Sequence, residues 1–347
     1  MEEKELMKKR LTVLITALMV GACFVAGCGN NSETAGEAGQ QEVQSASADT
    51  GENGTSDSTE TEAVDTTETA ETEETAAEEE TVAGNQAILV VSFGTSYNDS
   101  RDATIGAIEN AIADAFPEYE VRRAFTSQII IDKLKERDGL EIDNVEEALD
   151  RAVADGIETL VVQPTHLMNG YEYTDLADAL TEYEDKFNQI ALAEPLLTSD
   201  ADFDAVISAI TEHTASYDDG ETAICFMGHG TEADSNVVYA KLQEKITAAG
   251  FENYFIGTVE AEPSLEDVLA AVKEKGTYKK VVLEPLMVVA GDHANNDMAG
   301  DEEDSWKSVF ESEGFEVECL LEGLGQNEAI QQIYVEHTRA AVDSLAE

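Results

Sequence analysis

The chain has 347 residues, of which 42% are hydrophobic, enough to bury the core of one large domain or two ordinary ones. Asp and Glu total 74 against 20 Lys and Arg, and the formal net charge of -54 excludes a nucleic-acid binder that works through a basic face. Such a surface is more often a solubility device than a functional one, although it also raises the local concentration of divalent cations.

The first 28 residues have the pattern of a bacterial lipoprotein signal peptide. A basic start precedes an apolar run over residues 11–26, which is slightly short for a stable membrane span. The tetrapeptide Val25-Ala26-Gly27-Cys28 resembles a lipobox, whose cysteine is diacylated and becomes the new N-terminus. We therefore expect an extracytoplasmic lipoprotein that is anchored to the membrane of a bacterium through Cys28, since two acyl chains give stable anchoring. An uncleaved anchor helix is the alternative.

Residues 29–86 are rich in Thr, Glu, Ala, Ser and Gly. They include 16 acidic residues, no Lys or Arg, and no apolar periodicity. Such a segment cannot offset the entropy that ordering would cost, so we expect a disordered acidic tether that self-repulsion keeps extended. The folded region is then residues 87–347.

From residue 87 onward, strand patterns alternate with helix patterns. The first strand, residues 87–91, is a continuous apolar run typical of a parallel sheet that is covered on both faces. A loop over residues 92–100 leads to a helix, and a capping box at Asn144 starts a further helix that ends at Gly156. Further strands are expected near residues 119–125, 159–163 and 254–259, and the first helix has an apolar face of Ile105, Ile108, Ile112 and Phe116. This alternation predicts an α/β fold with parallel, doubly wound sheets flanked by helices.

The second half of the folded region repeats the first. Residues 223–231 restate residues 87–95, with His229 at the position of Phe93. Residues 282–293 restate residues 161–172, so that Gly291-Asp292-His293 matches Gly170-Tyr171-Glu172. We therefore predict two similar lobes, about 87–200 and 201–347, that face each other about a pseudo-twofold axis.

Polar side chains gather at the predicted carboxyl ends of the strands, where open α/β sheets bind their ligands. The first lobe supplies Glu172 and the segment from Phe93 to Ser96, and the second supplies His229, Glu260 and His293. Two imidazoles with one or two carboxylates suit Co²⁺, Ni²⁺, Fe²⁺ or Zn²⁺, and the same groups can accept protons. His229 lies between two glycines, which let a ligand approach closely.

The other three histidines carry weaker signals. His213 and His337 fall in amphipathic helical stretches and are interpreted as surface residues. His166 follows a strand near the same rim, and the pattern leaves open whether it lines the cleft or sits at the edge of the core.

Several stretches of the chain together resemble the anaerobic-pathway sirohydrochlorin cobaltochelatases, class II chelatases that are relatives of ferrochelatase. Each stretch alone would be weak, but together they span nearly all of residues 87–340. The stretches are Leu89-Val-Val-Ser-Phe-Gly-Thr-Ser-Tyr97, Arg123-Ala-Phe-Thr-Ser127, Phe226-Met-Gly-His-Gly230, Val259-Glu260, Pro285-Leu-Met-Val-Val-Ala-Gly-Asp-His293, Asp297-Met298 and Asp304-Ser-Trp-Lys307.

The resemblance implies a role for each candidate residue. His229 and His293 correspond to the metal-binding and catalytic pair, and Glu172 and Glu260 to active-site acids, Glu172 in catalysis and Glu260 beside the metal. The segment of Ser92, Phe93, Gly94, Thr95 and Ser96 corresponds to one that holds the tetrapyrrole. The implied reaction inserts Co²⁺, with Fe²⁺ or Ni²⁺ as further candidates, into sirohydrochlorin for cobalamin biosynthesis, without ATP or another nucleotide.

Two departures from the family pattern affect the biological role. Tyr171 stands where the family usually has an acidic residue, so contacts at that rim differ. The lipoprotein signal is the larger departure, because corrin synthesis is cytoplasmic in most organisms. The alternative function is an extracytoplasmic lipoprotein that binds haem, another tetrapyrrole or a metal for uptake, without turnover. The oligomeric state, a homo-oligomer included, stays open.

Overall fold

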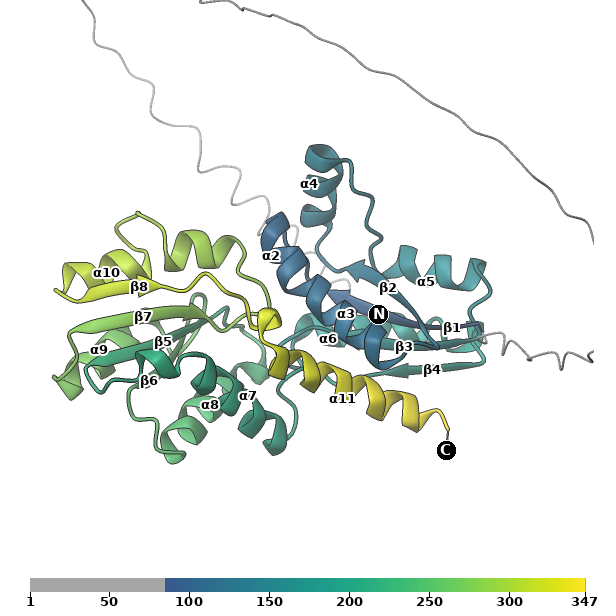
Figure 1. Cartoon of the computed structure of the whole chain (residues 1–347). Helices are drawn as coiled ribbons and strands as arrows, with labels where there is room; N and C mark the ends of the chain where they lie inside the picture. The colour runs from purple at the N-terminus through teal and green to yellow at the C-terminus, as the bar shows by residue number, and fades with distance from the viewer. Residues whose placement is uncertain (1–84, 347) are drawn as a thin grey trace, which may run out of the picture. The chain divides into compact units, whose positions relative to one another are not determined.

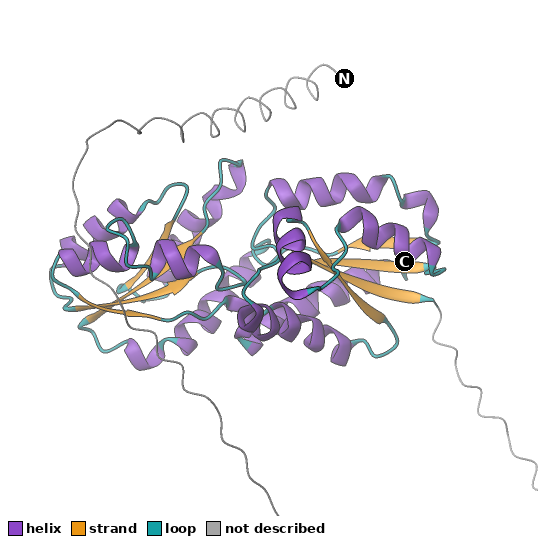
Figure 2. Cartoon of the chain, turned by 90° about the horizontal axis from the view of Figure 1, so that it is seen from above, coloured by secondary structure: helices purple, strands orange, loops and turns teal. Residues whose placement is uncertain are grey.

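The computed structural model describes residues 85–346, so the predicted signal peptide, Cys28 and nearly all of the predicted tether lie outside the described residues. The described part forms two lobes, each built on a four-stranded parallel sheet (Figures 1 and 2). The strand orders are β2-β1-β3-β4 and β6-β5-β7-β8, so each strand of one sheet has a counterpart at the same place in the other. The predicted α/β fold with two similar lobes is confirmed, while the twofold axis between them stays a prediction.

The first lobe contains the sheet of β1 to β4 and the helices that follow its strands. Its elements are β1 (Gln86–Ser92), α2 (Asn98–Ala103), α3 (Ile105–Ala115), β2 (Glu120–Phe125), α4 (Gln128–Asp138), α5 (Val145–Ala154), β3 (Thr159–Pro164), α6 (Tyr171–Thr181), the 3₁₀ turn η1 (Glu184–Lys186) and β4 (Gln189–Leu192).

The second lobe repeats this alternation after a connecting segment. Its elements are α7 (Asp200–His213), η2 (Ala215–Tyr217), β5 (Thr222–Gly228), η3 (Asp234–Asn236), α8 (Val237–Ala248), β6 (Tyr254–Thr258), α9 (Leu265–Lys275), β7 (Lys280–Pro285), the π-helical turn η4 (Ala294–Met298), α10 (Trp306–Ser312), β8 (Glu316–Cys319), η5 (Leu324–Gln326) and α11 (Glu328–Ser344).

Strand β1 shows why the central strands read as unbroken apolar runs. Its residues Ile88 and Val90 join one hydrophobic cluster, and Leu89 and Val91 join another on the opposite face of the sheet. Strand β5 alternates in the same way, with Ile224 facing one cluster and its neighbours facing another. Both faces of each sheet are therefore covered, so neither face can be polar.

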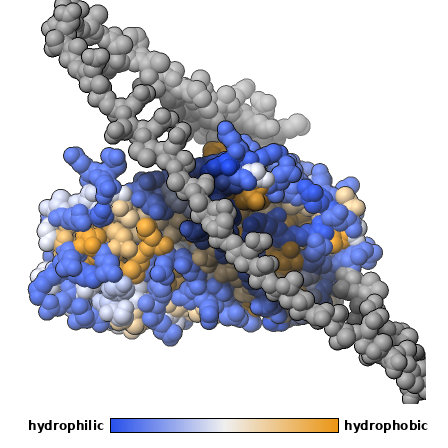
Figure 3. All heavy atoms as spheres, turned by 45° about the horizontal axis from the view of Figure 1, so that its top comes forward, coloured by the Kyte–Doolittle hydropathy of each residue, from blue (hydrophilic) through white to orange (hydrophobic). Residues whose placement is uncertain are grey.

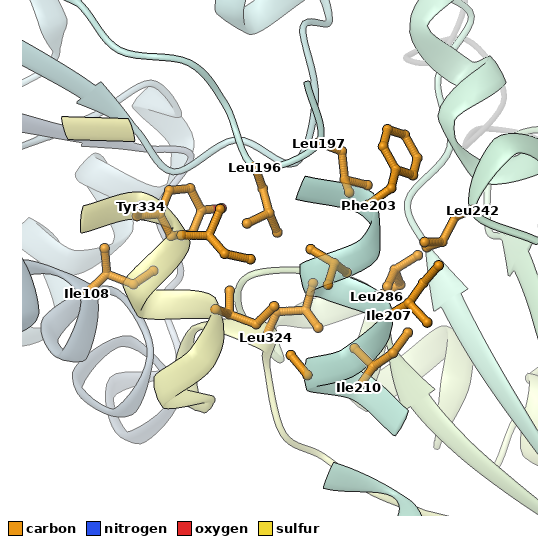
Figure 4. Packing of buried hydrophobic residues seen from close by; sticks show 14 of the residues in the cluster. Ile108, Leu196, Leu197, Phe203, Ile207, Ile210, Leu242, Leu286, Leu324 and Tyr334 are labelled. Carbon is orange, nitrogen blue, oxygen red and sulfur yellow. The ribbon is translucent and has the colours of Figure 1, made fainter. Parts of the chain in front are cut away.

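One hydrophobic cluster is shared by the two lobes. Figure 4 shows Ile108 of α3 and Tyr334 of α11 beside Leu196 of the connecting segment and Ile207 of α7, all members of this cluster. Helix α11 contacts α3, β3 and β4 as well as α7. A lobe boundary near residue 200 assigns α11 to the second lobe by sequence, whereas its apolar face is buried largely against the first.

Most predicted element boundaries agree with the structure to within a residue or two. The capping box predicted at Asn144 starts α5, and the structure shows a second one at Ser264 that starts α9. The predicted loop over residues 92–100 is shorter than expected, because α2 already begins at Asn98 and a break at Thr104 separates it from α3. Strand β1 begins at Gln86, one residue before the predicted start.

The exposed surface agrees with the acidic composition. Hydrophilic residues dominate the face in Figure 3, with smaller hydrophobic areas between them. Among the residues that the structure describes, no helix combines the length and apolar character needed to cross a membrane.

Candidate active site between the lobes

A cavity of about 690 Å³ opens between the lobes at the carboxyl ends of the central strands. Its volume falls in the range of small-molecule and cofactor sites. It is lined by every metal, catalytic and tetrapyrrole-binding residue predicted from the sequence, and also by His166: Ser92, Phe93, Gly94, Thr95, Ser96, His166, Glu172, His229, Glu260 and His293. Residues that lie up to about two hundred positions apart therefore share one site.

His229 is the first residue after β5, and its neighbours leave it little freedom. A Cβ at Gly228 would lie 2.3 Å from the Tyr239 ring, and one at Gly230 would lie 2.8 Å from the Ala261 nitrogen. His229 Nδ1 lies 2.9 Å from the carbonyl oxygen of Gly230. Because a carbonyl oxygen only accepts, Nδ1 carries the proton, and the neutral ring presents the lone pair of Nε2.

His293 precedes the π-helical turn η4, and a carboxylate orients its ring. Its Nδ1 donates to Asp297 Oδ2 at 2.6 Å, one helical turn further along the chain. With Nδ1 engaged in this way, Nε2 is left to act as a ligand. π-Helical turns of this kind occur frequently at functional sites.

His229, Glu260 and His293 form the one cluster in residues 85–346 whose ligand atoms all lie within 4.8 Å of one another. The two imidazole rings meet edge to face with centroids 4.7 Å apart. Glu260 Oε2 lies 4.0 Å from His229 Nδ1, and the Glu260 backbone N–H donates to the His229 carbonyl. All three follow strands of the second lobe, so that lobe alone holds a donor set suited to a divalent transition metal.

The first lobe contributes Glu172 and His166 to the lining of the same cavity. Glu172 lies in the first turn of α6, and its Oε2 is 3.3 Å from His166 Nε2. The His166 side chain is only 8% exposed, and neither ring nitrogen has a well-aligned hydrogen-bond partner among the described residues. His166 therefore lines the cleft, which the sequence left open.

The segment after β1 turns sharply into the cavity. Gly94 has a φ of +95°, and a Cβ there would lie 2.5 Å from the Phe125 ring, so glycine is required. The turn leaves Phe93 half exposed and buries Thr95 and Ser96. Thr165 donates to the Ser92 hydroxyl at 2.8 Å, which joins the ends of β1 and β3.

Tyr97 and Asp292 connect the two rims of the cavity. The Tyr97 hydroxyl donates to Asp292 Oδ1 at 3.5 Å, a long contact between the first and second lobes. Partial burial, with the Asp292 charge as a second cause, raises the pKa of Tyr97. No Lys or Arg is among the described residues that line the cavity, so its polar walls are carboxylates, imidazoles, hydroxyls and backbone groups.

Two histidines lie elsewhere, and one of them is not the surface residue that the sequence predicts. His213 is on the surface, although two glutamates approach its ring. The His337 side chain is only 14% exposed and lies 3.1 Å from Asp202 Oδ1. The surface prediction for His337 was wrong because α11 packs against α7, and the His337 ring also lies 3.2 Å from the carbonyl oxygen of Glu194.

Asp297, the partner of His293, was given no role in the sequence prediction. The signal was present, because a carboxylate four residues after a histidine lies on the same side of a helix.

Known proteins of similar sequence match this chain along the described region. The chain is 38% identical to the sirohydrochlorin cobaltochelatase of Salmonella typhimurium over 262 residues, which cover 76% of this chain and 98% of that protein. It is 31% identical to sirohydrochlorin cobaltochelatase CbiKC of Nitratidesulfovibrio vulgaris, covering 75% of this chain and 92% of the relative.

Solved structures agree on the fold. SirB from Bacillus subtilis, solved with Fe³⁺, aligns with a TM-score of 0.54 over 76% of this chain and 98% of its own, at 12% identity. A family model described as cobalt chelatase (CbiK) matches residues 86–343, nearly the whole described part. The chain therefore belongs to the cobalt chelatase (CbiK) family.

Proposed function

We propose that the protein is a sirohydrochlorin cobaltochelatase, which inserts Co²⁺ into sirohydrochlorin without ATP and releases two protons. The observation that carries the proposal is the cluster of His229, Glu260 and His293 on the wall of a 690 Å³ cavity between two lobes. The relatives that carry this name support the same substrate pair.

The second lobe supplies the groups that deliver the metal. Both imidazoles have Nδ1 engaged, His229 with the Gly230 carbonyl and His293 with Asp297, so each offers Nε2 to the incoming ion. Glu260, about half exposed, can exchange carboxylate oxygens for the water molecules of the hydrated cation. Co²⁺ suits this mixture of imidazole and carboxylate, and Fe²⁺ and Ni²⁺ are further candidate substrates.

The first lobe supplies a proton acceptor. The macrocycle must lose two pyrrole protons, and Glu172 lines the same cavity as the metal cluster, with His166 Nε2 3.3 Å away. We assign Glu172 as the acceptor, because a carboxylate within hydrogen-bond reach of the reacting group is a suitable general base. The exposed ring of Phe93 offers a flat apolar surface to the tetrapyrrole.

The carboxylates of the macrocycle need hydrogen-bond or ion-pair partners, and no Lys or Arg is among the described residues that line this cavity. The hydroxyls and backbone N–H groups of the Ser92–Ser96 segment can take some of them. A neighbouring cavity of about 670 Å³ shares Ser96 and Tyr97 with the first and is lined by Lys133 and Arg137. We expect the remaining carboxylates to point toward these two cations.

The decisive experiment is a chelation assay on the purified protein with sirohydrochlorin and Co²⁺, Fe²⁺ and Ni²⁺ in parallel. The expected result is metal insertion well above the uncatalysed rate, seen as an absorbance change of the macrocycle, and its loss in His229→Ala. An intact protein that binds tetrapyrrole tightly without turnover would contradict the enzyme and support the uptake lipoprotein instead.

We also propose that this chelatase works outside the cytoplasm on a lipid anchor at Cys28. The support is the basic start, the apolar run and the lipobox-like tetrapeptide of the first 28 residues. Metabolic labelling with a radioactive fatty acid tests it: the wild-type chain should incorporate label and fractionate with membranes, and Cys28→Ser should do neither. An unlabelled wild-type chain in the membrane fraction would instead support an uncleaved anchor helix.

A further inference from the structure

Gln163 and Glu284 occupy matched positions in the two lobes, but the hydrogen bonding of their side chains differs. Gln163 pairs with Val90 in the first sheet and Glu284 with Phe226 in the second, and each precedes a proline. Every polar atom of the fully buried Gln163 side chain is satisfied, by Thr338 on one side and by the Pro164 and Glu194 carbonyls on the other.

Glu284 has no such set of partners. Its side chain is 5% exposed, and its Oε2 has no hydrogen-bond partner among the described residues. No Lys or Arg of residues 85–346 forms an ion pair with it. A buried carboxylate that has neither a hydrogen bond nor a Lys or Arg beside it is among the most costly groups that a folded protein can hold, so its presence calls for a cation.

Two further metal-ligating side chains face the same point. His213, the last residue of α7, places Nε2 3.6 Å from Glu284 Oε1. The same Nε2 lies 3.5 Å from Oε2 of Glu322, which follows β8. The C-terminal end of α7 also carries the negative end of the helix dipole, which favours a cation.

Two of the three donor distances are those of ligands around a small divalent ion. Nitrogen and oxygen ligands about 2.0–2.2 Å from a tetrahedrally coordinated ion lie about 3.3–3.6 Å from one another. The distances from His213 to the two carboxylates match this spacing. The three ligand atoms do not all lie within 4.8 Å of one another, so an ion would have to draw the half-exposed Glu322 toward Glu284. One imidazole with two carboxylates is a donor set for Zn²⁺, Co²⁺ or Mn²⁺ rather than for Ca²⁺, which takes oxygen ligands alone.

We propose that His213, Glu284 and Glu322 bind a second divalent transition-metal ion, separate from the substrate site. The two sites share no residue. The ion would connect the end of α7, the strand β7 and the segment after β8, three parts of the second lobe.

The test is a calorimetric titration of the full chain with Zn²⁺, in a His229→Ala/His293→Ala background that disables the substrate site. Millimolar Mg²⁺ in the buffer occupies weak carboxylate sites elsewhere on this acidic chain. We expect one equivalent of Zn²⁺ to bind and to raise the melting temperature by several degrees when it is present at about 100 times its dissociation constant. No binding in this background would overturn the proposal.

Matched variants identify the ligands. Glu284→Gln copies the residue of the first lobe and should weaken Zn²⁺ binding at least about tenfold and abolish the temperature shift. Glu322→Gln, at a half-exposed position that leaves the core untouched, should do the same. Glu318→Gln is the control, because Glu318 pairs with Lys280 and Tyr217 and should bind Zn²⁺ like the parent. Unchanged binding in both ligand variants would contradict the site.

Discussion

The segments after β1 and β5 occupy equivalent places in the two sheets, and both turn at a glycine with positive φ, 95° at Gly94 and 84° at Gly230. The residue before each glycine is about half exposed to the cavity, but it is Phe93 in the first lobe and His229 in the second. The same backbone thus presents an apolar ring on one side and a metal ligand on the other.

The same division recurs at the other strand ends. The position of Glu172 in the first lobe is that of His293 in the second, and the position of Gln163 is that of Glu284. The fold repeats because it depends on apolar alternation and glycine turns, which both halves keep. The chemistry differs because single side chains at strand ends can change without disturbing the apolar alternation or the glycine turns.

The largest expected effect comes from giving the second lobe the residue of the first. His229→Phe keeps a planar ring but removes the metal ligand, and we expect the rate of Co²⁺ insertion to fall at least about 100-fold. The melting temperature should change little, because the His229 side chain is 48% exposed. The chelation assay and thermal melts measure the two effects. Phe93→Leu is the matched control; an equal loss there would show that the lobes do not divide the work.

The second prediction concerns the unequal pair Gln163 and Glu284. Because burial and Glu322 raise the pKa of Glu284 to about 8, the native state keeps a proton that the unfolded chain releases above about pH 4.3. The free energy of unfolding therefore falls as pH rises from about 5 to about 8, by an amount on the order of a few kcal/mol. Urea unfolding with a chelator present measures it.

Glu284→Gln isolates this contribution, because His213 and all other titrating groups are common to both proteins. The variant should be less sensitive to pH over that interval and more stable than the wild type near pH 8. Parallel stability profiles would show that Glu284 is ionised and compensated even without metal.

The third prediction addresses how the second lobe orients its imidazoles. Asp297→Asn removes the carboxylate that holds His293 Nδ1 at 2.6 Å, and we expect the KM for Co²⁺ to rise about 10–100-fold. Steady-state kinetics at saturating sirohydrochlorin measure it. The control is Asp292→Asn, since Asp292 contacts Tyr97 and Asn296 rather than a histidine. Similar changes in both variants would indicate a general loss of acidic charge at the cavity rim.

The sequence was sufficient for the first three strands of each sheet, the lobes and the location of the site, whereas the edge strands β4 and β8 were not predicted. Apolar runs covered on both faces, capping boxes and the internal repeat are local signals, and the carboxyl ends of parallel strands meet at one edge. Contacts between distant segments could not be predicted. His337 was predicted to be a surface residue because no neighbouring residue in the sequence indicates its contact with Asp202 or the packing of α11 against α7. Glu284 was not singled out, because its position within a strand does not indicate which side chains surround it.

The smallest expected effect is at His166, an imidazole of the first lobe that lies outside the metal cluster of His229, Glu260 and His293. If His166 positions Glu172 through the 3.3 Å contact, His166→Gln should lower kcat by no more than about tenfold and leave the KM for Co²⁺ unchanged. A change in the KM instead would place His166 among the metal-handling groups. Because the His166 ring is buried, a loss of stability alone, with both kinetic constants intact, would return it to a purely structural role. The outcome decides whether the division of labour between the lobes is complete: metal handling in the second and proton transfer in the first.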